Sequence, residues 1–66
     1  MQKQISFSWW QGNDIHKEIS YLHQSELLRA AGNKIAEMIN EGYVEGQLLH
    51  EIDDIQFAGY WAIYQN

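Results

Sequence analysis

The chain has 66 residues, enough for one small domain, and it contains no cysteine. Disulfide bridges and thiolate zinc sites are therefore excluded as sources of stability. Nine acidic and four basic side chains give an acidic protein with a formal net charge of −5. This balance argues against nucleic acid and anionic membranes as partners, because both require a positively charged surface.

Size and hydropathy set further expectations. A chain this short buries only about 60% of the surface that its unfolded form exposes, so association with a second copy is an accessible source of stability. No apolar run approaches the roughly 18 residues of a membrane span. The segment Met1-Gln2-Lys3-Gln4 runs directly into a strand-like pattern and has no signal-peptide core. We therefore expect a cytoplasmic protein that does not bind membranes.

The first predicted element is a β-strand over residues 4–10, whose side chains alternate between two faces with a period of two. One face carries Ile5, Phe7 and Trp9, and the other carries Ser6, Ser8 and Trp10. Turn-forming residues at 11–14 end the strand.

A helix is predicted over residues 20–41. Apolar side chains recur every three to four positions on one face, at Leu28, Ala31, Ile35, Met38 and Ile39. Ser20 is a suitable N-cap, and Gly42 is typical of the left-handed residue that ends a helix. Gly32 in the helix interior costs about 1 kcal/mol relative to alanine unless close packing uses it.

Residues 15–22 are open between loop and helix. Ile15, Ile19 and Leu22 keep helical spacing, but they fall on the side opposite the later apolar stripe. A single helix from residue 14 would thus carry two opposed apolar faces, so we predict an ordered loop before Ser20. The three side chains then either close one end of the core or form a second contact site.

Two more strands are predicted, at residues 46–52 and 56–64. The first segment is ambiguous between strand and helix, and we favour a strand because it follows Gly42, contains Gly46 and precedes the turn-like pair Asp53-Asp54. The second strand alternates between one face with Phe57, Gly59, Trp61 and Ile63 and another with Ala58, Tyr60, Ala62 and Tyr64.

Together these elements predict an α+β single domain of order β-α-β-β. Its three-stranded, mainly antiparallel sheet has one helix packed on one face. The face under the helix is expected to carry Phe7, Trp9, Phe57, Trp61 and Ile63. Because the helix must pack on this face, the four aromatic residues among them are predicted to belong to the core.

Three segments resemble a group of small bacterial and phage-borne proteins that have no established activity. These segments are Phe7-Ser8-Trp9-Trp10, residues 35–48, which end in Glu41-Gly42-Tyr43-Val44-Glu45-Gly46-Gln47-Leu48, and Gly59-Tyr60-Trp61. The group shares an S-W-W strand, an E-G-Y-x-x-G-E-L stretch after a helix, and a closing G-W-W strand; here Gln47 replaces the glutamate and Tyr60 replaces a tryptophan. The resemblance covers about half of the chain, favours a strand at 46–52 and implies a prophage or mobile-element gene.

Catalytic and metal-binding roles find little support in the sequence. His23 and Glu26 lie on adjacent turns of one helix face, with His50 on a separate strand, whereas a metal site needs three or four convergent ligands. Asp53-Asp54 are neighbours whose side chains point apart, so they do not form a catalytic carboxylate pair. Since the chain also has no glycine-rich phosphate loop and no nucleophile motif, we predict a non-enzymatic protein without catalytic residues, metal ligands or cofactors.

The aromatic side chains opposite the helix are the strongest functional signal. Trp10, Tyr60 and Tyr64 share this face and are separated by small residues such as Ser8 and Ala62. Exposed tyrosine and tryptophan are typical of protein interfaces. Base stacking is disfavoured because no basic groove accompanies the rings. We therefore predict that these five residues form an interaction surface.

Three hypotheses follow for the function. In the first, the protein is a homodimer, either because the uncovered sheet faces meet or because edge strands pair across a two-fold axis. In the second, a phage- or mobile-element-encoded inhibitor or adaptor uses the same face to bind a host protein, with an acidic rim at Glu45, Glu51, Asp53 and Asp54. In the third, a small-ligand site or an active site forms between subunits.

Overall fold

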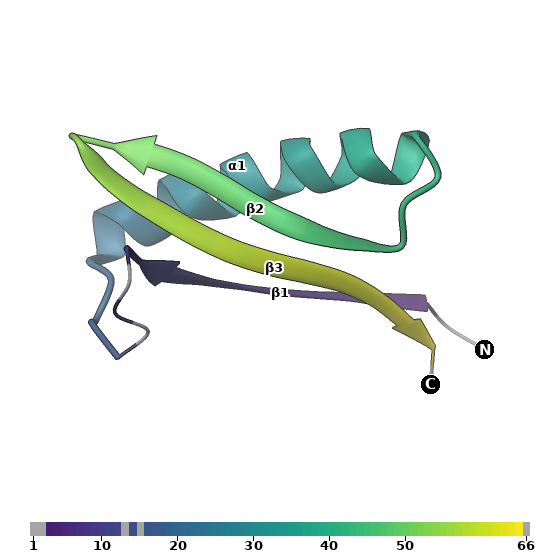
Figure 1. Cartoon of the computed structure of the whole chain (residues 1–66), viewed down its shortest axis with the longest axis horizontal. Helices are drawn as coiled ribbons and strands as arrows, with labels where there is room; N and C mark the ends of the chain where they lie inside the picture. The colour runs from purple at the N-terminus through teal and green to yellow at the C-terminus, as the bar shows by residue number, and fades with distance from the viewer. Residues whose placement is uncertain (1–2, 13, 15, 66) are drawn as a thin grey trace.

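The computed structural model describes residues 3–12, 14 and 16–65 of the chain. The elements follow in the order β1 (Lys3–Gln11), α1 (Tyr21–Asn40), β2 (Glu45–Ile52) and β3 (Ile55–Gln65) (Figure 1). The α+β class and the β-α-β-β order are thus confirmed, and the segment that was ambiguous between strand and helix is the strand β2.

The three strands form one sheet with the order β1-β3-β2, in which both outer strands run antiparallel to β3 (Figure 1). Phe7 of β1 and Gly46 of β2 both lie opposite Trp61 of β3. The last strand in sequence is therefore the central strand, and β1 and β2 are the two edges of the sheet.

The β2–β3 hairpin closes through the two residues Asp53 and Asp54, which have φ angles of 50° and 66°. Two consecutive residues with positive φ define the turn whose twist matches that of an antiparallel pair, and aspartate tolerates this conformation better than most residues. This local chemistry fixes the register of β2 against β3.

Both ends of α1 are capped as the sequence predicts. The Ser20 side chain accepts a hydrogen bond from the His23 N–H at 3.2 Å. At the other end Gly42 has a φ of 100°, its N–H donates to the Ile39 carbonyl, and the Tyr43 N–H donates to the Met38 carbonyl, both at 3.0 Å. These two bonds satisfy carbonyls that the end of the helix would otherwise leave unpaired.

The core lies between α1 and the sheet in two adjoining clusters. One cluster contains Ala31, Ile35, Leu48 and Trp61, and the other contains Leu27, Ile52 and Phe57. Fully burying one large apolar side chain stabilises a fold by about 1.5–3 kcal/mol. These seven are the buried apolar side chains among the described residues, so the core is small.

Two glycines make room for indole rings in this core. A Cβ atom on Gly46 would lie 2.9 Å from the Trp61 Nε1 atom, and one on Gly59 would lie 3.0 Å from the Trp9 ring. The Trp61 indole N–H donates to the Met38 sulfur at 2.9 Å. Glycine at these two strand positions therefore leaves the space that the rings occupy.

The apolar residues before the helix separate in the structure. Ile19 packs against the cluster of Leu27 and Phe57 and so closes one end of the core. Leu22 stays 81% exposed in the first turn of α1, which begins after Ser20. Ile15 lies outside the described residues.

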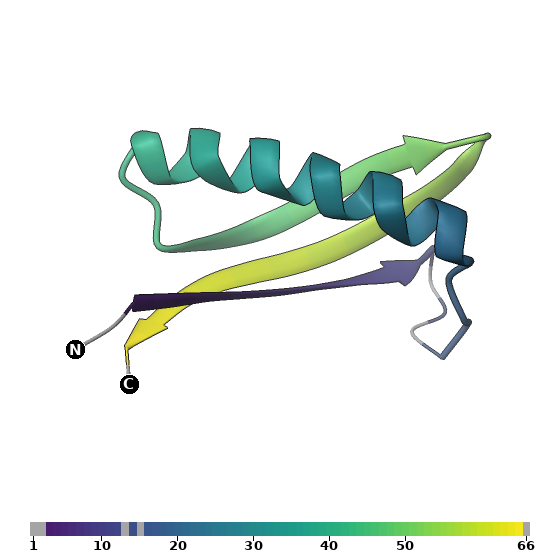
Figure 2. The same ribbon diagram turned by 180° about the vertical axis from the view of Figure 1, so that it is seen from behind.

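The prediction that Phe7 belongs to the core is wrong. Its side chain is on the helix side of the sheet but remains 39% exposed, and Ile5 beside it remains 48% exposed. The helix approaches β2 more closely than β1, and Figure 2 shows α1 and β1 diverging toward the C-terminal end of the helix. An apolar groove is left between them, with a volume of about 310 Å³.

Candidate functional site

The side of the sheet turned away from α1, called the open face below, contains all five residues predicted to form an interaction surface. Neighbours across an antiparallel sheet point to the same side. Trp10 lies opposite Ala58, and Ala58 lies opposite Leu49. One step along the sheet, Ser8 and Gln47 lie on either side of Tyr60. Ala62 and Tyr64 continue the same side of β3.

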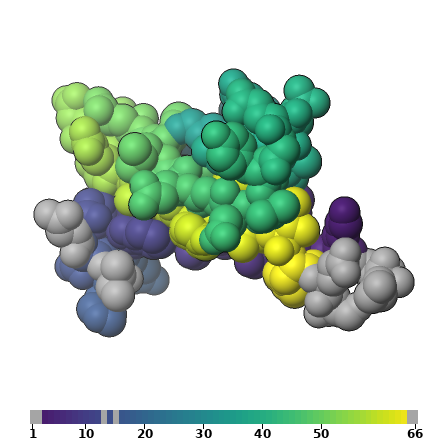
Figure 3. Space-filling model, turned by 45° about the vertical axis from the view of Figure 1, so that its right-hand side comes forward, coloured from purple at the N-terminus to yellow at the C-terminus, as the bar shows by residue number. Residues whose placement is uncertain are grey.

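Large apolar groups on the open face are accessible to a partner. Tyr60 is 41% exposed, Tyr64 is 45% exposed and Leu49 is 65% exposed, whereas Trp10 is half-buried. Trp10, Leu49, Ala58 and Tyr60 line a shallow hollow of about 160 Å³. Figure 3 shows that the three strands, coloured purple, green and yellow, form one continuous surface in this part of the molecule.

Leu49 is a member of the open face that the sequence-based prediction omitted. It stands directly beside Ala58 and has the largest exposed fraction of the apolar groups on this face. Leu48 and His50 flank Leu49 in β2 and lie on the helix side of the sheet, so the period of two along the strand was the signal that would have placed Leu49 on the open face.

The open face is acidic at its rim. Glu45 and Glu51 extend from the two ends of β2 on this side, and the described strands place no lysine or arginine beside them. The expectation that Asp53 completes this rim is wrong. Its carboxylate lies 3.7 Å from the His23 Nε2 atom, on the side of the sheet that α1 covers.

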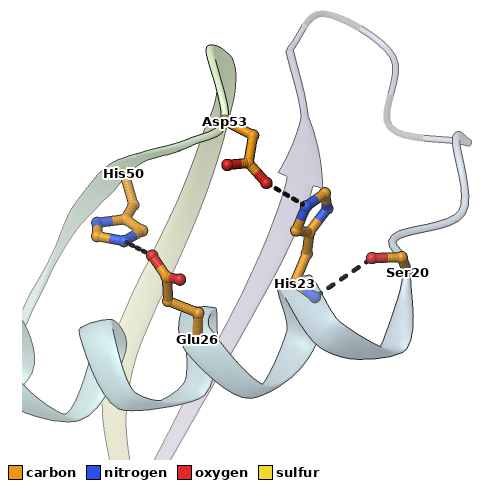
Figure 4. A network of polar contacts seen from close by, with 5 residues as sticks. All are labelled: Ser20, His23, Glu26, His50 and Asp53. Carbon is orange, nitrogen blue, oxygen red and sulfur yellow. Dashed lines mark hydrogen bonds and ion pairs between the residues drawn. The ribbon is translucent and has the colours of Figure 1, made fainter.

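His23 and His50 join α1 to the β2–β3 hairpin (Figure 4). His50 Nε2 lies 3.1 Å from the Glu26 carboxylate, and His23 contacts Asp53 as well as the edge of the Phe57 ring. His23 and Glu26 thus each reach a different residue of the hairpin instead of each other. These contacts are partly exposed polar links between helix and sheet, which contribute modestly to stability.

Metal-binding and membrane-spanning features are not found in the described part of the chain. Within residues 3–12, 14 and 16–65, no three histidine, aspartate or glutamate side chains converge on a point that a metal ion would occupy. The single described helix, α1, is too polar to cross a bilayer.

Comparison of the chain with models of protein families, with curated proteins and with solved structures finds no match.

Proposed function

We propose that the protein is a small, non-enzymatic protein-interaction module and that the open face is its contact surface. One observation carries the proposal: a surface of aromatic and aliphatic side chains spans all three strands, and the helix covers the opposite side. Large exposed apolar patches on small proteins mark sites of association.

The residue types on the open face support contact with another protein. Tyrosine and tryptophan bury a large area for little loss of side-chain entropy, and they dominate the binding energy at many interfaces. The small side chains of Ala58 and Ala62 leave space between Trp10, Tyr60 and Tyr64 that a partner's side chains would fill.

The charges on the open face favour a different protein over a second copy as its partner. Glu45 and Glu51 would complement a basic rim around an apolar centre. Two copies that met through this face would instead bring like charges together. We therefore propose an adaptor or inhibitor that binds a basic protein surface, and the resemblance noted above would place such a protein in a prophage or mobile element. The homodimer through the open face stays a prediction, and so does a ligand site between subunits.

Capture experiments with two matched variants test this proposal. Leu49→Ser/Tyr60→Ser removes one leucine and one tyrosine from the open face, and Tyr21→Ser/Leu22→Ser removes the same two residue types from the first turn of α1, where both are 81% exposed. Proteins captured from a lysate of the source cells by the tagged wild type should also be captured by the helix variant and be lost with the open-face variant.

Circular dichroism and thermal unfolding of both variants serve as the folding control. Equal capture by all three proteins would contradict the proposal, as would an equal loss in both variants, because neither result depends on the open face.

A further inference from the structure

From Ile5 to Trp9, the outer edge of β1 carries backbone groups that no described part of the chain satisfies, whereas at Gln11 the edge is bridged by Asp14. The Gly12 N–H donates to the Gln56 carbonyl at 2.8 Å. Because bonded and non-bonded pairs alternate along an antiparallel ladder, this contact and the register direct the backbone groups of Ser6 and Ser8 toward β3. Those of Ile5, Phe7 and Trp9 therefore point away from the sheet.

The other edge of the sheet is protected. The Ile63 N–H donates to the Val44 carbonyl at 2.8 Å, so by the same alternation the backbone groups of Leu49 point outward from β2. Lys34 of α1 donates a hydrogen bond to that Leu49 carbonyl. A lysine over an exposed strand is a common device against edge-to-edge pairing. Of the two edge strands, β1 is therefore the one whose outward backbone groups are available for pairing with another strand.

Among the described residues, no comparable device protects β1 between Ile5 and Trp9. It runs for nine residues without proline, and Lys3 at one end is its single charged side chain. On its helix side the edge adjoins the apolar groove lined by Ile5, Phe7, Gly32, Ile35, Ala36 and Ile39. An unprotected edge beside an apolar groove combines backbone hydrogen bonding with apolar burial for an added strand.

We propose that β1 pairs antiparallel with β1 of a second copy of the chain, across a two-fold axis at Phe7. This register places Ile5 opposite the partner's Trp9 and uses every outward-facing backbone group from Ile5 to Trp9. It ends before Gln11, whose carbonyl already accepts a hydrogen bond from the Asp14 N–H at 3.0 Å. The two sheets become one sheet of six strands. Phe7 of each copy packs beside its equivalent where the two grooves merge.

Charge and symmetry favour a second copy over an unrelated peptide as the occupant of this edge. Each chain carries a net charge of −5, yet β1 contains no acidic residue, so two copies meet here without repulsion between carboxylates. Antiparallel pairing of a strand with itself is symmetric by construction, as a closed dimer requires.

The inference deepens the proposed function, on which it rests, because the protein is taken to act by contact and the dimer leaves the open face free. That face then extends over six strands, with two copies of Trp10 and Tyr60 on the same side. The dimer thereby has twice the partner-binding surface of one chain, and none of that surface is buried where the two copies meet.

Amide hydrogen exchange by NMR, combined with solution mass by light scattering, tests the edge pairing. The wild type should have the mass of a dimer, and the amides of Ile5, Phe7 and Trp9 should exchange as slowly as those of Ser6 and Ser8. A monomer at every concentration would overturn the inference. So would a dimer in which the three outward amides exchange as fast as unpaired ones.

Two variants at one position isolate the backbone contribution. Ile5→Pro removes an N–H that has no partner within the described chain, and Ile5→Ala removes a similar part of the side chain but keeps the N–H. The dissociation constant should rise at least about tenfold more with proline than with alanine, because two symmetric hydrogen bonds are lost. Equal dissociation constants would count against edge pairing.

The open-face variant separates this inference from the proposed function. Leu49→Ser/Tyr60→Ser should remain a dimer with slow exchange at Phe7 while losing its captured partner. If the variant is instead a monomer, the open face is the self-interface and the edge model is overturned. If it is a dimer that still captures the partner, the proposed function fails and the edge pairing stands.

Discussion

Gly59 of β3 lies so close to β1 that no side chain fits there. A Cβ atom would clash with the Ser8 carbonyl oxygen and lie 3.0 Å from the Trp9 ring. Because the Ser8 oxygen belongs to the backbone, it cannot move without disturbing the pairing of β1 with β3. Gly59→Ala should therefore lower the free energy of unfolding by more than about 2 kcal/mol in chemical denaturation.

Gly32→Ala is the matched control for that measurement. Nothing lies within 4 Å of a Cβ atom at this helical position, so alanine should raise the free energy of unfolding by up to about 1 kcal/mol. If the two alanine variants had the same effect, the close approach at Gly59 would not determine the stability of the β1–β3 pair.

The hairpin turn offers a stabilising change at a single residue. Asp54 has a φ of 66° and follows Asp53, whose φ is 50°. An Asp-Gly pair is preferred in this type of turn because glycine adopts positive φ without strain. Asp54→Gly should raise the free energy of unfolding by up to about 1 kcal/mol, measured by thermal or chemical unfolding. A lower melting temperature would show that the Asp54 carboxylate contributes more than its backbone strain costs.

At the scale of elements, α1 protects one edge of the sheet while it shields the core. Lys34→Met removes the ammonium group that donates to the Leu49 carbonyl and leaves the β2 edge open. We expect stronger concentration-dependent association of this variant in light scattering, beyond the wild-type mass, because exposed edges pair with one another. Lys34→Arg keeps a donor and should behave as the wild type does. Unchanged mass in Lys34→Met would mean that the helix itself blocks this edge.

The elements were largely predictable because their signals are local. Ser20 and Gly42 fix the ends of α1 through hydrogen bonds to neighbouring residues, and the Asp53-Asp54 pair fixes the hairpin. The exposure of Phe7 was not predictable, because it depends on the position of α1 over β2 instead of β1. Strand order and helix position are set by packing between distant residues, which a pattern along the chain does not encode.

The candidate site was predictable in part for the same reason. Alternation along β1 and β3 placed Trp10, Tyr60 and Tyr64 on one side of the sheet. Asp53 was assigned to the wrong side because its contact with His23 forms only once the helix packs against the hairpin. Contacts between distant residues of this kind are seen in the structure, but the spacing of residues along the sequence does not predict them.

At the scale of the whole molecule, the small core and the free edge of β1 together make stability depend on concentration. If folding and pairing are coupled, mass action stabilises the folded dimer as protein is added. We expect the melting temperature of the wild type to rise with protein concentration, and that of Ile5→Pro to stay constant. Differential scanning calorimetry over a range of concentrations would measure this. A wild-type melting temperature independent of concentration would argue for a self-sufficient monomer.

The central position of β3 also governs the order of events during synthesis. β1 leaves the ribosome before β3, which is the strand it pairs with in the described part of the chain and the later of the two in sequence. The hairpin of β2 and β3 closes a short loop, whereas β1 must wait for a contact across nearly the whole chain. Trp9 and Trp10 therefore stay unpaired in the nascent chain until β3 emerges, and this interval is when the polypeptide is most exposed to chaperones and to aggregation.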